Sequence, residues 1–102
     1  MSNPLLKGLR PVHPGEMLRE DILPAVGKPK AEIARLLGIS RQTLYDILNE
    51  KQPITAAMAL RLGKLFGDGA EIWLNMQRNY DLKLAERELG DKLDAIPRLE
   101  AA

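Results

Sequence analysis

The sequence contains no cysteine and only one histidine, His13, among its 102 residues. Without thiols the chain forms no disulfide, thiolate zinc site, iron–sulfur cluster or cysteine nucleophile, and one histidine excludes a multi-histidine metal site within one chain. No apolar run approaches the ~18–20 residues of a membrane span, and the N-terminus lacks the apolar region of a signal peptide. These absences predict a cytoplasmic protein that uses no cofactor and enters no membrane.

Aromatic residues are also scarce, at 4% of the chain. The core must therefore be built from leucine, isoleucine and alanine. Because leucine and alanine are strong helix formers, this composition favours helices over strands. Apolar residues make up 45% of the sequence and charged residues 28%, which is ordinary for one folded domain. We expect a single all-α domain with no room for a second core.

Proline and glycine residues divide the chain into segments with helical spacing. Residues 1–13 are expected to form an irregular arm, residues 14–84 the folded domain, and residues 85–102 a tail that is either a short helix or disordered. Within these bounds the apolar spacing predicts five helices and no strand. The first helix begins at Pro14 and is ended by Pro24 and Gly27. The second runs from about Lys30 to Leu37 and the third from Arg41 to about Asn49. The fourth is capped by Thr55 and extends through Phe66, and the fifth runs from about Ala70 to Leu89.

The segment between Lys30 and Asn49 carries the clearest pattern. Two short helices are joined by a three-residue link that begins at Gly38. A steep helix crossing needs a small side chain, which Ala34 supplies, and the turn needs a residue that accepts positive φ, which Gly38 supplies. Leu44 follows six positions later and faces the same core. This spacing is typical of a helix-turn-helix motif.

The outward side of the helix from Arg41 is polar, above all in its first half. In a helix-turn-helix motif this part of the second helix enters the major groove and contacts base edges. Arg41 can pair with guanine and Gln42 with adenine. Thr43 or Tyr45 can meet a thymine methyl group or a phosphate, and Asp46 can pair with Arg41 or accept a hydrogen bond from cytosine N4. The expected base-contacting residues are Ser40, Arg41, Gln42, Thr43, Tyr45 and Asp46.

Basic residues flank this helix as phosphate-binding residues would. The expected set is Lys28, Lys30, Lys51 and Arg61. Residues 28–64 hold seven basic and three acidic residues, a net charge of +4, and residues 81–102 hold four basic and six acidic residues, a net charge of −2. A polar helix face is usually only a solvated face, and neutral domains often show such charge swings. DNA binding is therefore favoured by the helix spacing rather than by the charge.

Other chemistry has little support in the sequence. No nucleophile–base pair is present, and Gly67-Asp68-Gly69 lacks the lysine and the preceding strand of a phosphate-binding loop. We therefore expect a protein that is not an enzyme. His13 precedes Pro14 and is expected to cap a helix or to lie on the surface.

Three residues of the last helix form an apolar stripe: Trp73, Met76 and Tyr80. Such a stripe more often belongs to a core than to a ligand site. Here it is expected outside the core of the first four helices, and a partial role in a dimer interface is equally open. A homodimer would read two half-sites about one turn of the duplex apart.

The run from Ala34 to Leu44 (Ala-x3-Gly-Ile-Ser-Arg-x-Thr-Leu) resembles the Xre/Cro class of phage-repressor-like domains. Three further runs resemble the HigA antitoxin family, also called VapI-like. They are residues 13–18 (His-Pro-Gly-Glu-Met-Leu), 58–62 (Met-Ala-Leu-Arg-Leu) and 73–82 (Trp-Leu-Asn-Met-Gln-x-x-Tyr-Asp-Leu). The resemblance covers about residues 12–84.

The resemblance implies a five-helix, lambda repressor-like fold with an extended C-terminal helix. It also implies a dimeric bacterial antitoxin that represses its own promoter by binding an operator in double-stranded DNA. Such a protein neutralises a HigB-like toxin, an mRNA-cleaving ribonuclease of the RelE type. Two alternatives remain open at this point: an Xre-family regulator with no toxin partner, and a protein-interaction module that kept the scaffold but lost DNA binding.

Two positions depart from the pattern of this class. The third helix is usually followed by Asn-Gly-Lys, but Glu50 occupies the glycine position here. If that position needs positive φ, Glu50 carries backbone strain of ~1 kcal/mol or more. The family also often has serine where Tyr45 stands, so we expect an operator that differs from those of relatives.

Overall fold

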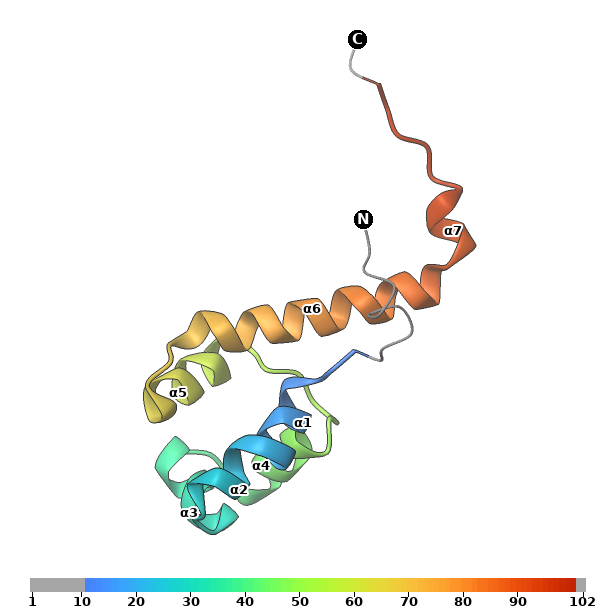
Figure 1. The fold of residues 1–102 in the computed structure, drawn as a ribbon. Helices are drawn as coiled ribbons and strands as arrows, with labels where there is room; N and C mark the ends of the chain where they lie inside the picture. The colour runs from blue at the N-terminus through green and yellow to red at the C-terminus, as the bar shows by residue number, and fades with distance from the viewer. Residues whose placement is uncertain (1–10, 101–102) are drawn as a thin grey trace.

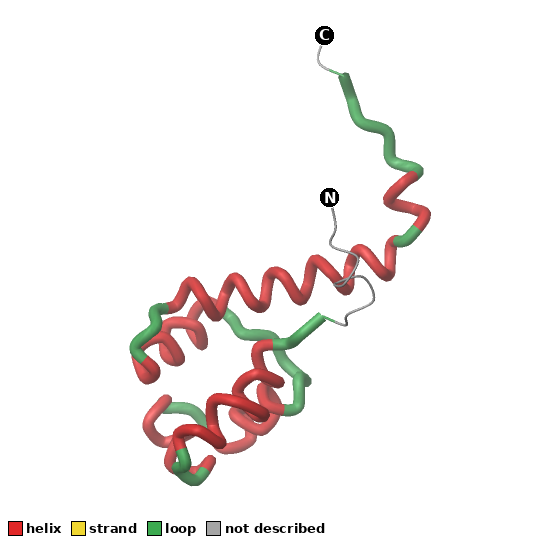
Figure 2. The backbone as a smooth tube through the Cα atoms, viewed as in Figure 1, coloured by secondary structure: helices red, strands yellow, loops and turns green. Residues whose placement is uncertain are grey.

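The computed structural model describes residues 11–100, so residues 1–10 of the expected arm and residues 101–102 of the tail lie outside the described part. Every regular element within residues 11–100 is helical, which confirms the all-α fold (Figures 1 and 2). The elements are α1 (Pro14–Met17), η2 (Leu18–Ile22), α2 (Leu23–Val26), α3 (Lys30–Leu37), α4 (Arg41–Leu48), α5 (Ala56–Phe66), α6 (Ala70–Leu89) and α7 (Asp91–Asp94).

The first helical segment runs through α1, η2 and α2 without a break. The expectation that Pro24 contributes to ending it is wrong: the helix passes through Pro24, and Gly27 ends it with a φ of 74°. The reason is η2, a π-helical turn in which the Leu23 N–H donates to the Leu18 carbonyl. Such a widened turn tolerates a following proline, whose ring and missing N–H disturb a regular α-helix.

The helix-turn-helix pair has the geometry that its spacing predicts. Gly38 ends α3 with a φ of 74°, and Ala34 at the crossing is only 1% exposed. Ser40 caps α4 by accepting a hydrogen bond from the Thr43 N–H at 3.0 Å. Thr55 caps α5 in the same way. The predicted end of α3 at Gly38 and the predicted caps Ser40 and Thr55 are therefore confirmed.

The core is mainly aliphatic, as composition predicts, but it includes the tryptophan. Trp73 is 0% exposed within one chain, and its indole N–H donates to the Asp68 carboxylate at 3.0 Å. Its assignment to a dimer interface is therefore corrected: α6 packs against α5 and inserts Trp73 among core residues. Met76 and Tyr80, further along α6, are half-buried.

The second half of α6 extends beyond the helices it packs against, followed by α7 and the described end of the tail (Figure 1). The described part of the molecule is elongated for this reason, at 55 × 32 × 23 Å. α6 ends at Leu89, as the periodicity predicts, and the tail contains the short helix α7. Several apolar side chains on this extension are exposed: Leu82, Leu89, Leu93, Ile96 and Leu99.

Two buried polar side chains tie α6 to the rest of the fold. Gln77 accepts a hydrogen bond from the Ile54 N–H at 2.8 Å and donates to Asp81 at 3.0 Å. His13, 2% exposed, caps α1 by accepting from the Gly15 N–H at 2.8 Å, and its ring meets the Tyr80 ring edge-on. Capping was expected of His13, but burial was not, and nothing in the sequence pattern singled out Gln77.

Burial lowers the pKa of His13 below its ordinary value of about 6.5, although the charges of Glu50 and Asp81 oppose this. The unfolded chain therefore binds a proton at His13 more readily than the folded chain does. The stability that neutral His13 contributes is fully present above about pH 6.5 and is lost as the pH falls toward the lower pKa of the folded state. We expect the melting temperature to fall as the pH is lowered from about pH 6.5 to pH 5.5.

The matched variant is His13→Asn, which keeps a cap acceptor but does not titrate. Thermal melts followed by circular dichroism should show a smaller pH dependence in this variant over the same range. Equal slopes in the two proteins would contradict the assignment.

Candidate nucleic-acid interface

One side of α4 is buried and the other is open to solvent. Leu44, Ile47 and Leu48 are each at most 2% exposed, so this side is fixed against the core. Arg41, Gln42 and Tyr45 lie exposed on other faces of the helix. Because a short helix with one side locked cannot rotate, its polar residues form a rigid surface. We call the residues Ser40, Arg41, Gln42, Thr43, Tyr45 and Asp46 the polar front.

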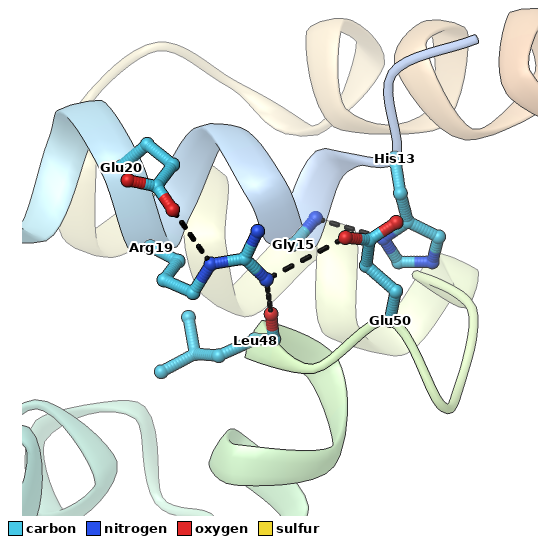
Figure 3. A network of polar contacts seen from close by, with 6 residues as sticks. All are labelled: His13, Gly15, Arg19, Glu20, Leu48 and Glu50. Atoms are coloured by element: carbon cyan, nitrogen blue, oxygen red, sulfur yellow. Dashed lines mark hydrogen bonds and ion pairs between the residues drawn. The ribbon is translucent and has the colours of Figure 1, made fainter. Parts of the chain in front are cut away.

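The end of α4 is held to the first helical segment by Arg19 (Figure 3). The Arg19 guanidinium donates to the Leu48 carbonyl, lies 3.5 Å from the Glu50 carboxylate, and pairs with Glu20 at 3.0 Å. It satisfies one of the carbonyls that a helix end leaves without a partner. No sequence signal marked Arg19, because its partners at the end of α4, Leu48 and Glu50, lie about thirty residues away.

Close approach of α1 to α4 requires a glycine. A Cβ atom at Gly15 would lie 1.8 Å from the Ile47 carbonyl oxygen, so any side chain there would push the two helices apart. In the sequence, Gly15 belongs to the run of residues 13–18 that resembles the HigA family. Its place inside the first turn of a helix, where glycine is a poor choice, is a signal that could have identified it.

The two expected base-pairing side chains differ in how free they are. Among the described residues, Arg41 has no hydrogen-bond or ion-pair partner, so its full donor fork is available. The Gln42 amide instead donates from Nε2 to the Asp46 carboxylate at 2.8 Å. The sequence allows Asp46 to pair with Arg41. Within the described residues its hydrogen-bond partner is Gln42 instead.

The remaining members of the polar front are also engaged with neighbours. The Ser40 hydroxyl donates to the Thr43 hydroxyl at 2.8 Å while it caps α4. The Tyr45 side chain is 41% exposed, and the Lys30 ammonium lies 5.9 Å from the centre of its ring. That distance suits a cation–π contact, which orients both groups at the edge of the polar front.

The expected phosphate-binding residues are all exposed, and three of them lie in or beside the helix-turn-helix pair. Arg61 has an additional role that sequence reasoning missed. Its Nη1 atom donates to the Leu37 carbonyl at 2.7 Å and to the Gly38 carbonyl at 3.4 Å, so it caps the end of α3. Its other nitrogen atoms remain available for a phosphate.

Other kinds of site receive no support from residues 11–100. No cluster of three histidine or acidic side chains in this part of the chain could hold a metal ion. Within the same residues, none of the helices combines the length and the apolar character that a membrane crossing requires.

Comparison with known proteins supports a helix-turn-helix protein. A helix-turn-helix family model matches residues 18–72, which is more than half of the chain. Virulence-associated protein I of Dichelobacter nodosus is 45% identical over 89 residues, covering 86% of this chain and 82% of that protein.

Two solved structures are similar to this chain in both sequence and fold. The Pseudomonas aeruginosa antitoxin HigA with the higBA promoter is 39% identical with a TM-score of 0.83, covering 89% of this chain and 100% of that one. The antitoxin GraA in complex with its operator is 40% identical with a TM-score of 0.84, covering 99% of each chain.

The chain belongs to the HigA-like group of the Xre-type helix-turn-helix family.

The turn after α4 holds Glu50, one of the two positions at which the sequence departs from the pattern expected of the class. Glu50 has a φ of 62° and is the sole residue other than glycine in the described range with positive φ. The expected strain is therefore present. The Glu50 carboxylate reaches Arg19 at 3.5 Å, and such a half-exposed ion pair offsets only part of the strain.

Replacement of Glu50 by glycine should stabilise the HigA-like fold, because glycine has no Cβ to clash in the left-handed region. We expect Glu50→Gly to raise the free energy of unfolding by about 1 kcal/mol, measured by urea denaturation.

Two controls separate backbone strain from charge. Glu50→Gln keeps the strained backbone and removes the carboxylate, so it should change stability little. Asn49→Gly acts at a neighbouring φ of −91°, where glycine relieves nothing and should be destabilising. The interpretation is wrong if Glu50→Gly is no more stable than Glu50→Gln.

Proposed function

We propose that the protein is a homodimeric repressor that binds an operator at its own promoter and acts as the antitoxin of a toxin–antitoxin pair in the cytoplasm. The observation that carries this proposal is the polar front of α4, held outward by a buried opposite side and capped at its first residue. Support comes from relatives of the same length range whose structures contain promoter or operator DNA.

Within this proposal the polar front reads bases in the major groove. Arg41 pairs with guanine O6 and N7, and Gln42 with adenine N6 and N7. Thr43 and Tyr45 contact a thymine methyl group or a phosphate, with Ser40 positioning the start of the helix. The phosphate-binding residues are Lys28, Lys30, Lys51 and Arg61, which set register and orientation without reading sequence.

The dimer interface is proposed along α6, without Trp73. Met76 and Tyr80 are half-buried and line an open hollow of about 390 Å³ together with Pro11, Val12 and Met17. Val12 is 49% exposed at its rim. A second copy packed on this hollow would give a dimer that carries two polar fronts. Once one polar front is bound to its half-site, the second polar front is held at a high effective concentration near the other half-site.

Arg41→Ala and Lys30→Ala test the two kinds of DNA contact. Arg41→Ala should cost ~1–3 kcal/mol of discrimination between the operator and unrelated DNA. Lys30→Ala should weaken binding to both and reduce the salt slope by about 1, because it removes a phosphate contact. The measurement is a fluorescence anisotropy titration at several salt concentrations, on an operator mapped by footprinting upstream of the protein's own gene.

Lys92→Ala, on the exposed part of α7, is the matched control for loss of one positive charge and should leave binding unchanged. Equal losses on every sequence from Arg41→Ala would refute base reading by the polar front. A footprint without two related half-sites would count against the dimer.

The antitoxin part of the proposal concerns a HigB-like, RelE-type mRNA-cleaving toxin and rests on the family resemblance. We expect a neighbouring gene for a small basic protein whose expression alone stops growth. Co-expression of this chain should restore growth, and the two proteins should copurify. Absence of such a gene would instead favour an Xre-family regulator with no toxin partner.

A further inference from the structure

Asp46 is an unexpected residue on a surface proposed to meet DNA. Asp46 lies on α4 one turn after Gln42, and the Gln42 Nε2 donates to its Oδ1 at 2.8 Å in a solvent-exposed hydrogen bond. A negative charge that approaches the phosphate backbone is repelled, so it weakens binding to every sequence. A carboxylate at this place therefore has to contribute specificity if it contributes anything to recognition.

The chemistry of the pair determines which way the Gln42 amide points. An ionised carboxylate only accepts hydrogen bonds, so Asp46 can bind the NH₂ end of the amide and never its oxygen. This holds Nε2 toward Asp46 and directs Oε1 away from it. One Nε2 hydrogen is used by Asp46, whereas the second hydrogen and Oε1 stay free.

The free donor and acceptor are the pair that adenine requires. In the major groove adenine presents N7 as an acceptor and its N6 amino group as a donor, in a fixed order. An amide rotated by half a turn presents its donor and acceptor in the reverse order. A glutamine held in one orientation before binding therefore discriminates better than one that exchanges between two.

We propose that Asp46 is a positioning residue for base recognition: it holds Gln42 in the orientation that reads adenine and so sets specificity at that one base pair. This inference rests on the proposed DNA-binding function and adds to it. It replaces the direct contact of Asp46 with a cytosine as the role of this side chain.

The test compares Asp46→Asn with Asp46→Glu in the full-length protein. Asparagine can donate as well as accept, so it permits both orientations of Gln42, whereas glutamate remains an acceptor only. Affinities are measured by fluorescence anisotropy on operators in which each base pair of a half-site is replaced in turn. The Gln42 base pair is the one that Gln42→Ala no longer discriminates.

We expect Asp46→Asn to reduce discrimination at the Gln42 base pair roughly three- to tenfold and to leave the other positions unchanged. Its affinity for unrelated DNA should stay equal or rise, because a repelling charge is removed. Asp46→Glu should restore much of the discrimination. Glu71→Gln on α6 is the control for net charge and should leave discrimination at every position unchanged.

A double-mutant cycle separates positioning from direct contact. If Asp46 acts through Gln42, adding Asp46→Ala to Gln42→Ala should change no base preference. A preference that still changes in this background, or a wild-type preference kept by Asp46→Asn, would overturn the inference while the proposed function stands. Wild-type protein that binds all duplexes equally would overturn both.

Discussion

Burial of one side of α4 is the constraint on which the rest of the structure depends. Leu44, Ile47 and Leu48 are almost completely removed from water, and each such side chain contributes about 1.5–3 kcal/mol relative to an exposed one. Rotation of α4 would expose these groups and bury its polar residues instead. The apolar side therefore determines where Arg41 and Gln42 point, although neither touches the core.

Both ends of α4 are fastened by polar contacts from different parts of the chain. Ser40 supplies the cap at the start, and Arg19 supplies a donor to the Leu48 carbonyl at the end (Figure 3). The strained backbone of Glu50 lies two residues beyond this second contact. A strained residue persists where its surroundings hold it in place, and here Arg19 and the neighbouring helices do so.

α6 serves two purposes that conflict in its sequence. Its first half must close the core, which it does through Trp73 and the buried amide of Gln77. Its second half projects from the domain and carries exposed leucines. A helix with one buried half and one open half has no single apolar side along its whole length. For this reason the apolar periodicity predicted where α6 ends but not which of its residues are buried in the core.

Local signals in the sequence determined the helices and the turn between them. Caps such as Ser40 and Thr55, and the positive φ of Gly38, depend on residues within one or two turns, so spacing alone revealed them. The tertiary structure decided which distant groups meet: Arg19 with Leu48, Arg61 with Leu37, and Trp73 with the core. A periodic pattern states that one side of a helix is apolar or polar but not which partner that side will contact. That choice follows from how all the helices pack together.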